Sequence, residues 1–298
     1  MPKIIIIGNS AAGFSCCDTL VKNPTEKEIT VISAEDYSAY NRNLLLGYLA
    51  GSIGEDELFL CPDDYYEKNK VRFLKNSKVA LVETKKQRLT LKDNTKINYD
   101  YLVIASGSKP VLPDIAGNSK EGVFIFYALE EIKEIKQRLM LADTVAIVGE
   151  PMVCVELAGV PLLRDKEVKI IAKTRPDSFS PSGKQEWIEG LEVNEIIGEG
   201  AQMQAIKLTN GKVIGMPLVI FAGAHLPASE FLKGSDIETR DGCVIVNDLM
   251  RTSIENVFAC GSVASAKTWD DAIKEGITAA ESLIKQTKGE NNLCQQTS

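Results

Sequence analysis

The stretch KIIIIGNSAAG at residues 3–13 decides the fold. Its unbroken isoleucine run predicts a strand buried on both faces, which is typical of a parallel sheet. A glycine-bounded turn follows, and the pattern then predicts a helix over residues 11–21 and a second strand over residues 29–32. Strand, helix and strand in this order form a βαβ unit. Its turn places backbone N–H groups at the positive end of a helix, where phosphates bind.

The same turn matches the dinucleotide-binding fingerprint in part. Gly8 permits the sharp turn and Gly13 permits close packing of helix against strand, but Ser10 stands where the fingerprint has its second glycine. Glu35, about 20 residues further along, is placed to accept a hydrogen bond from a ribose hydroxyl. The alternative is a tight turn that binds no ligand. The residues expected to face a pyrophosphate are Gly8, Ser10, Ala11, Ala12 and Gly13.

The pattern of strand, turn and helix occurs a second time further along the chain. Residues 145–148 predict a strand that ends at Gly149, residues 168–171 a second strand, and residues 218–221 a late strand of the same domain. This duplication predicts an α/β protein with two Rossmann-like, three-layer βαβ dinucleotide-binding domains, the second inserted in the first. The expected boundaries are 1–110 and 239–285 for the first domain, 111–238 for the second, and 286–298 for a polar tail.

Charge and composition narrow the class of protein. The 298 residues carry a formal net charge of −7, which argues against a nucleic-acid partner. No apolar run approaches the roughly 20 residues that span a bilayer, and we recognise no secretory signal, so no membrane partner is expected and the cytoplasm is the expected location. Seven cysteines without a CxxC pair and a single histidine, His225, argue against a disulfide scaffold and a metal site.

Three further segments carry a family resemblance. They are YNR at 40–42 with YLAG at 48–51, YDYLVIASGSKP at 99–110, and Thr252 with VFACGS at 257–262. Together with the first turn, and in this order, they resemble the FAD-dependent pyridine-nucleotide–disulfide oxidoreductase superfamily. Within it the sequence is most similar to the NADH:rubredoxin and ferredoxin reductases and to the NADH oxidases. The resemblance runs from residue 3 to about residue 285.

The resemblance implies a flavoprotein in which FAD lies extended across the first domain. Glu35 would bind the adenosine ribose, Arg42 a phosphate, and Val79 the adenine through its backbone. By the same resemblance Trp269 and Ala272, where a helix is predicted to begin, would lie near the flavin ring. The N-terminus of that helix would then stabilise negative charge on the reduced flavin. For Trp269 the alternative is a core aromatic. The strand-end residues implied at the cofactor are Ala105, Ser106, Gly107, Gly261 and Ser262.

The sequence departs from that family at the flavin. Relatives end the second flavin motif in Gly-Asp, whereas this chain has Gly261 followed by Ser262, whose hydroxyl is a weaker acceptor with shorter reach. Replacing Ser262 by aspartate is therefore expected to tighten FAD binding by ~1–2 kcal/mol. No cysteine lies between Cys17 and Cys61, where thiol-dependent relatives have theirs, so no catalytic side chain is expected.

The second fingerprint is degenerate, which weakens the case for an NAD(P)H site. Gly149 and Glu156 remain and are the expected contacts of an NAD(P) cofactor. Pro151 removes a phosphate-binding N–H, Cys154 adds a side chain where helix and strand should touch, and Glu150 brings a negative charge to the pyrophosphate. We therefore expect poor binding of NADH and NADPH.

Two more departures concern the second domain and the C-terminal region. Lys173 and Arg175 stand in place of an acidic ribose ligand, where they either favour a 2′-phosphate or are simply solvated. The domain is short between residues 176 and 191, where the family has a longer helical segment, and the family's C-terminal interface domain is expected to be missing. Such losses indicate that a partner protein covers the surface that the missing parts would occupy.

Three hypotheses for function remain open. The first is an oxidoreductase that moves electrons from a reduced pyridine nucleotide, through bound flavin, to a small protein carrier of the iron–sulfur or rubredoxin type. The second is an FAD-bearing electron-transfer subunit of a larger redox complex that lacks its own NAD(P)H site. The third is a non-catalytic relic that kept the fold.

Overall fold

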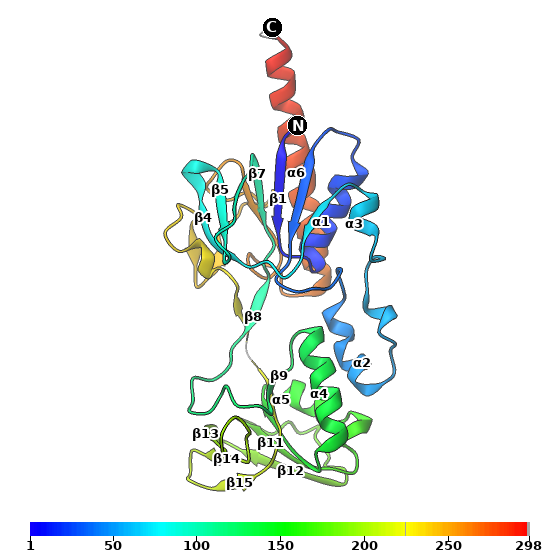
Figure 1. The fold of residues 1–298 in the computed structure, drawn as a ribbon, viewed down its shortest axis with the longest axis vertical. Coiled ribbons are helices and arrows are strands. Elements are labelled where there is room, and N and C mark those ends of the chain that lie inside the picture. The colour runs from blue at the N-terminus through cyan, green and yellow to red at the C-terminus, as the bar shows by residue number, and fades with distance from the viewer. Residues whose placement is uncertain (224, 297–298) are drawn as a thin grey trace. The chain divides into compact units, whose positions relative to one another are not determined.

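The computed structural model describes residues 1–223 and 225–296, which divide into two compact units (Figure 1). Unit 1 comprises residues 1–41, 59–109 and 226–298, and unit 2 comprises residues 42–58 and 110–225. Each unit has a parallel sheet of five strands, and the second unit is inserted in the first. The predicted α/β class with two Rossmann-like domains is therefore confirmed.

The sheet of unit 1 explains why its first strand is so apolar. Along β1, Ile4 and Ile6 point into one core cluster, whereas Ile5 and Ile7 point into another on the opposite face. Both faces of the sheet are covered, so every residue of the isoleucine run is buried. The strand order is β20-β7-β1-β2-β3. The strands are β1 (Lys3–Ile7), β2 (Glu28–Ile32), β3 (Arg72–Leu74), β7 (Tyr101–Ile104) and β20 (Val257–Ala259).

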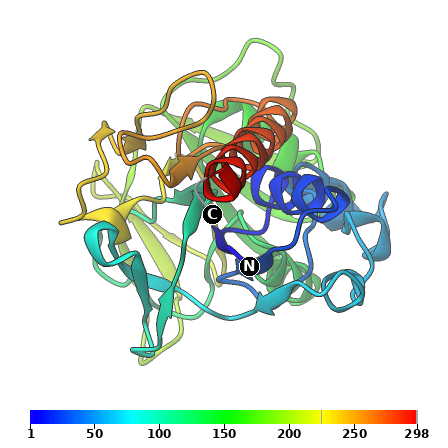
Figure 2. The same cartoon turned by 90° about the horizontal axis from the view of Figure 1, so that it is seen from above.

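Two helices cover one face of this sheet. Helix α1 (Ala11–Lys22) and helix α6 (Trp269–Gln296) lie side by side in Figures 1 and 2. They approach closely because α6 presents glycine and alanine to α1: a Cβ on Gly276 would lie 2.2 Å from the backbone oxygen of Ala12. The helix also continues past residue 285, where the sequence predicted a polar tail; the side chains beyond residue 288 and all of residues 297–298 lie outside the described part.

The other face of the unit 1 sheet is covered in part by a small antiparallel sheet. It consists of β4 (Val79–Glu83), β5 (Arg88–Leu91) and β6 (Lys96–Asn98). Val82, Leu89 and Leu91 pack from it into the same core cluster as Ile5. Unit 1 therefore has three layers.

Unit 2 repeats the parallel arrangement with the order β12-β11-β10-β16-β9. Residues 173–183, all of which the structure describes, contain no helix between β11 and β12, in agreement with the short segment expected there. The strands of the parallel sheet are β9 (Val123–Ile125), β10 (Thr144–Gly149), β11 (Glu167–Ala172), β12 (Lys184–Glu189) and β16 (Val219–Ala222). The helices are α4 (Leu129–Leu141) and α5 (Pro151–Ala158), and an antiparallel sheet is formed by β13 (Val193–Ile197), β14 (Ala205–Leu208) and β15 (Val213–Gly215).

The units differ from the expected domain boundaries in two places. Residues 42–58 group with unit 2 because α2 (Leu45–Ala50) packs against α4 and the Lys133 ammonium lies 2.6 Å from the Glu55 carboxylate. Residues 226–238 group with unit 1. Besides short 3₁₀ turns, the remaining α-helix and strands are α3 (Tyr65–Lys68), β8 (Ser108–Pro110), β17 (His225–Pro227), β18 (Thr239–Arg240) and β19 (Cys243–Val244). Among the residues described, no helix is long and apolar enough to cross a membrane.

Candidate functional site

Four of the segments singled out in the sequence follow the carboxyl ends of neighbouring parallel strands in unit 1. Gly8 follows β1, Glu35 lies just beyond β2, Ala105 follows β7 and Gly261 follows β20. Backbone hydrogen bonds tie these ends together: the Gly8 N–H donates to Ile32 O at 2.9 Å. Since ligands of such sheets bind beyond the carboxyl ends of the strands, this edge is the candidate site.

The first turn is packed so tightly that only glycine fits at two positions. Gly8 has a φ of +109°, and a Cβ on it would lie 2.0 Å from the Ala105 backbone oxygen. A Cβ on Gly13 would lie 2.1 Å from the Gly8 backbone oxygen, so α1 packs directly on the turn. Ser10 is the N-cap of α1 and makes no side-chain capping bond to the described residues. The first N–H groups of α1 therefore remain without a side-chain cap, which suits an anion.

Two distant segments converge on Ala12, in the first turn of α1. A Cβ on Gly261 would lie 2.9 Å from the Ala12 Cβ, and a Cβ on Gly276 would meet the Ala12 backbone oxygen. The turn after β20 and helix α6 are thereby fixed against the start of α1, directly after the glycine-rich turn. Sequence reasoning missed Gly276; its spacing of one helical turn from Ala272 and Ala280 was the available signal.

Tyr40 holds the carboxylate of Glu35. The Tyr40 hydroxyl donates to Glu35 Oε2 at 2.6 Å, and the Tyr40 side chain is only 4% exposed. Its backbone forms a β-bridge with Phe59, which fixes its position. A charge-assisted bond of this length orients the carboxylate. Tyr40 was noted only as part of a motif, because nothing in the sequence shows where its hydroxyl points.

Asn9, inside the glycine-rich turn, is held in the same way by Tyr66. The Tyr66 hydroxyl donates to Asn9 Oδ1 at 2.5 Å, and the Tyr66 ring stacks on Phe73 with 4.1 Å between ring centroids. Burial raises the pKa of Tyr66 well above its ordinary value, so the hydroxyl remains a donor. The buried Asn9 Nδ2 has no hydrogen-bond partner within the described part of the chain. It is a polar donor at the turn that a ligand could satisfy.

The turn after β7 is anchored on one side and open on the other. The Ser106 hydroxyl donates to Ala228 O at 2.7 Å, and the Ala228 N–H donates to Gly107 O at 3.0 Å. Gly107 has a φ of +69°, and no atom of the described residues lies within 4 Å of the place where its Cβ would sit. Ser106 thus has a structural partner, while Gly107 faces open space.

A carboxylate from α6 closes the turn after β20. The Gly261 N–H donates to Glu275 Oε2 at 2.7 Å, and the Ser265 hydroxyl donates to Glu275 Oε1 at 2.5 Å. Ser262, between these two donors, is exposed. Sequence reasoning missed Glu275, because its distance along the chain from the turn gives no hint of the contact.

The first turn of α6 is acidic and capped. The Asp271 N–H donates to Thr268 Oγ1 at 3.1 Å, and Asp270 and Asp271 supply two carboxylates. Trp269 is half-buried and packs against the core cluster that contains Ala272. The packing supports the core-aromatic alternative for Trp269, and contact of either residue with a flavin stays a prediction.

Arg42 and Val79 are placed differently from the other predicted residues. Arg42 belongs to unit 2, where its guanidinium lies 4.5 Å from the Tyr127 ring centroid and donates to Tyr127 O at 3.2 Å. The His225 ring lies 5.2 Å from the same tyrosine ring. Partial desolvation, followed by repulsion from Arg42, lowers the pKa of His225. Val79 begins β4, where it pairs with Leu91. The roles of Arg42 and Val79 at a cofactor stay predictions.

The second fingerprint keeps the tight glycine turn after its strand, but a side chain fills the place where helix α5 should touch the sheet. Gly149 has a φ of +145°, and a Cβ on it would lie 1.9 Å from Ala222 O. Pro151 is the first residue of α5, whereas the Cys154 side chain is fully buried. Burial, and then the Glu150 carboxylate, raises the pKa of the Cys154 thiol to about 12. Glu156 is exposed on α5, so it makes no buried contact there.

Arg175 is engaged with its own loop. Its guanidinium lies 5.3 Å from the Phe179 ring centroid, and its Nη2 donates to Phe179 O at 3.5 Å. Its backbone N–H donates to Glu189 Oε1 at 3.1 Å. These contacts favour a structural role over recognition of a 2′-phosphate.

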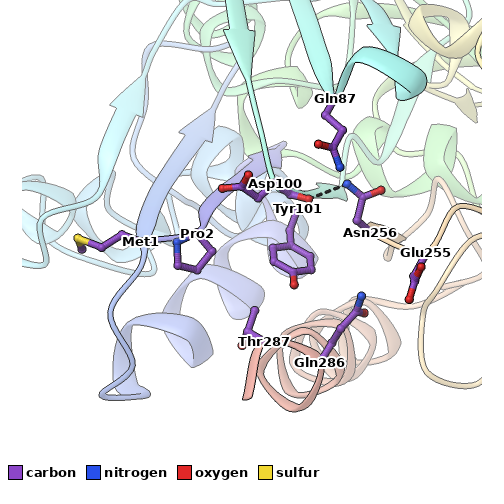
Figure 3. A pocket seen from close by; sticks show the side chains of 9 residues that line it. All are labelled: Met1, Pro2, Gln87, Asp100, Tyr101, Glu255, Asn256, Gln286 and Thr287. Carbon is purple, nitrogen blue, oxygen red and sulfur yellow. Dashed lines mark hydrogen bonds between the residues drawn. The ribbon is translucent and has the colours of Figure 1, made fainter. Parts of the chain in front are cut away.

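A separate hollow of about 650 Å³ lies at the opposite edge of the unit 1 sheet (Figure 3). Pro2, Asp100 and Asn256 line it, and each directly precedes a strand of that sheet, so it opens at the amino ends. The Asn256 amide donates to Asp100 O at 2.6 Å across it. This edge is not where ligands of parallel α/β sheets bind. Among the side chains that the structure describes, those of residues 1–223 and 225–288, no group of three His, Cys, Asp or Glu residues is placed to hold a metal ion.

Comparisons with known proteins agree with this geometry. The family model for pyridine nucleotide-disulphide oxidoreductases matches residues 2–276. The chain is 26% identical over 276 residues to the assimilatory nitrate reductase electron transfer subunit of Bacillus subtilis, which covers 88% of this chain and 36% of that protein. It is 28% identical to the NADH oxidase of Methanocaldococcus jannaschii, over 87% of this chain and 62% of the relative.

Other relatives extend the comparison. The NADH-rubredoxin oxidoreductase of Clostridium acetobutylicum is 28% identical, over 88% of this chain and 68% of the relative. The chain thus spans about one third to two thirds of the length of these three relatives. In the crystal structure of a covalent putidaredoxin reductase–putidaredoxin complex, one chain matches with a TM-score of 0.85 at 19% identity, over 95% of this chain and 75% of that one. At that identity the match shows the fold alone.

Proposed function

Because the chain belongs to the pyridine nucleotide-disulphide oxidoreductase family, we propose that it binds FAD in unit 1 and moves electrons between a reduced pyridine nucleotide and a protein electron carrier. The observation that supports this most is the convergence of the turns after β1, β7 and β20 on one sheet edge, with Ala12 fixed between Gly261 and Gly276. That edge offers a turn suited to phosphates and a carboxylate suited to a ribose; FAD, with its pyrophosphate and adenosine ribose, would use both, whereas FMN has no adenosine ribose.

The residues of unit 1 fit FAD. The uncapped first turn of α1 and the unpartnered Asn9 amide suit the pyrophosphate, and Glu35, oriented by Tyr40, suits the adenosine ribose. The open side of Gly107 leaves room for the body of the dinucleotide. When bound, FAD would supply the electron chemistry, and the protein would supply binding, orientation and electrostatics.

The carrier we propose is a small iron–sulfur or rubredoxin-type protein. Support comes from the relatives: one is an NADH-rubredoxin oxidoreductase, and another is an electron transfer subunit of a nitrate reductase. The protein itself needs no acid, base or nucleophile for such a transfer. This agrees with the burial of Cys16, Cys17 and Cys260, since burial raises the thiol pKa of each and keeps it unreactive.

A second candidate is an FAD-bearing electron-transfer subunit of a larger complex, without its own NAD(P)H site. The filled fingerprint of unit 2 favours it: the Cys154 side chain occupies the contact between α5 and the sheet, and Pro151 replaces an N–H donor. The nitrate reductase relative is named as such a subunit. Under this candidate, electrons enter from a partner protein.

Two measurements on the purified protein test these proposals. Release of the flavin by heat, followed by chromatography, should yield FAD; recovery of FMN, or of no flavin after incubation with FAD, would contradict the proposed cofactor. Anaerobic titration with NADH and NADPH then separates the candidates. Rapid reduction at micromolar nucleotide supports the reductase, and no reduction supports the electron-transfer subunit.

A further inference from the structure

We infer that the Glu275 carboxylate supplies the negative charge of the turn after β20, and that Ser262 is neutral because this charge is already present. The inference rests on the proposed function, since it deepens the account of the FAD site. It makes Glu275 a positioning residue that orders the turn and sets its charge. It also changes the outcome expected for an aspartate at position 262.

The geometry places the carboxylate inside the turn rather than beside it. Both oxygens of Glu275 accept hydrogen bonds, one from the Gly261 N–H and one from the Ser265 hydroxyl. These donors lie on either side of Ser262 along the chain. In addition, Glu275 contributes to raising the pKa of the adjacent, buried Cys260 thiol, after burial itself.

The backbone at position 275 is fixed by packing, so helix α6 cannot shift to make room for a second charge. Gly276, the next residue, is pressed against the backbone of Ala12, and Ala272, one turn earlier, is buried. The N-terminal turn of α6 already carries Asp270 and Asp271. A carboxylate at position 262 would therefore enter a turn with acidic groups on the helix next to it, where like charges repel.

If the role of Glu275 were purely structural, a different result would be expected. If Glu275 only closed the turn, an aspartate at position 262 would gain a charge-assisted bond to the ligand whatever stood at position 275. If the two positions share one negative charge, the effect at 262 depends on the residue at 275. The dependence of one substitution on the other is the measurable difference.

The test is a double-mutant cycle with Ser262→Asp, Glu275→Gln and the double variant, read by FAD titration of the apoprotein. We expect Ser262→Asp alone to weaken FAD binding about threefold or more, and to tighten it about tenfold in the Glu275→Gln background. Glu281→Gln, a change to an exposed carboxylate further along α6, is the matched control and should leave the Kd unchanged. If Ser262→Asp changed the Kd for FAD by the same factor with glutamate and with glutamine at position 275, the inference would be overturned.

Melting of the apoprotein separates this inference from the proposed function. With Glu275 present, Ser262→Asp should lower the Tm of the apoprotein; in the Glu275→Gln background it should not. If no variant binds FAD, the proposed function has failed and the coupling is judged on Tm alone. An equal Tm change in both backgrounds would then overturn the inference.

Discussion

Single side chains in unit 1 hold the groups that a dinucleotide would meet. Tyr40 orients the Glu35 carboxylate and Tyr66 orients the Asn9 amide, each through a buried or nearly buried hydroxyl. Neither tyrosine lies in the glycine fingerprint. Their role is to reduce the freedom of a binding group before the ligand arrives, which lowers the entropy cost of binding.

Tyr40→Phe should weaken FAD binding without unfolding the protein. The change removes the 2.6 Å bond to Glu35 Oε2 and keeps the ring in place. The expected loss is ~1 kcal/mol, or a Kd about fivefold higher, measured by titrating the apoprotein with FAD. In a Glu35→Ala background the same substitution should have no further effect. A loss of equal size in that background would show that Tyr40 acts by some other route.

His225→Gln should reduce the acid sensitivity of unit 2. The pKa of His225 is lowered in the folded protein, so the unfolded chain binds a proton first as pH falls below about 6.5. Wild type therefore loses stability as pH falls through that range, whereas the glutamine variant lacks this contribution.

The measurement is Tm at pH 7.5 and pH 5.5 for both forms. Because His225 is only partly shielded from solvent, we expect the drop in Tm to be smaller by only about 1–2 °C in the variant. The chain has no other histidine, which makes the comparison clean. High salt should shrink the difference by screening Arg42. If Tm fell by the same amount between pH 7.5 and pH 5.5 in both forms, His225 would not contribute to the acid sensitivity.

At the scale of elements, the decisive contact is that between α1 and α6. Gly276→Ala would place a methyl group 2.2 Å from the Ala12 backbone oxygen, so the helices must separate. We expect a loss of ~1–3 kcal/mol in urea unfolding and weaker FAD binding, because Ala12 lies in the first turn of α1, directly after the turn proposed to bind the pyrophosphate.

Gly159→Ala is the control for that substitution. Gly159 ends α5 with a φ of −77°, and its nearest contact for an added Cβ is an ordinary 3.4 Å. The free energy of unfolding of the Gly159→Ala variant should differ from that of wild type by less than about 1 kcal/mol. If Gly276→Ala were equally harmless, the close approach of the two helices would not be needed.

The regular elements were largely predictable, because apolar runs and glycine turns act locally. The strand over 3–7 and the repeat at 144–149 follow from such patterns, whereas the missing helix in 173–183 was expected only from the comparison with the family. The end of α6 was misjudged, since a polar helix segment and a polar tail have the same composition. Tyr40 and Glu275 could not be assigned their partners, because those contacts join residues through tertiary packing.

At the scale of the whole molecule, the question is whether unit 2 delivers electrons to unit 1. We expect NADH and NADPH to reduce the bound flavin slowly, since the fingerprint of unit 2 has a proline and a buried cysteine where glycines belong and an exposed acid, Glu150, beside the phosphate position. Each defect costs ~1 kcal/mol, and together they weaken binding by about a hundredfold or more.

Stopped-flow reduction of wild type and of the triple variant Glu150→Gly, Pro151→Gly, Cys154→Gly provides the measurement. Faster reduction of the variant would identify the lost glycines as the cause. Its Tm must be recorded alongside, because removing the buried Cys154 side chain leaves a cavity. Rapid reduction of wild type at micromolar NADH would instead remove the main support for the electron-transfer-subunit candidate.

The meeting of three segments at Ala12 has a consequence for how the protein is made. Residues 12, 261 and 276 touch, yet a ribosome adding about 5–20 residues per second produces the last of them many seconds after the first. The glycine-rich turn is synthesised first but stays incomplete until α6 has emerged. Flavin capture should therefore follow translation of residue 276, and a nascent chain stalled before that point should not retain FAD.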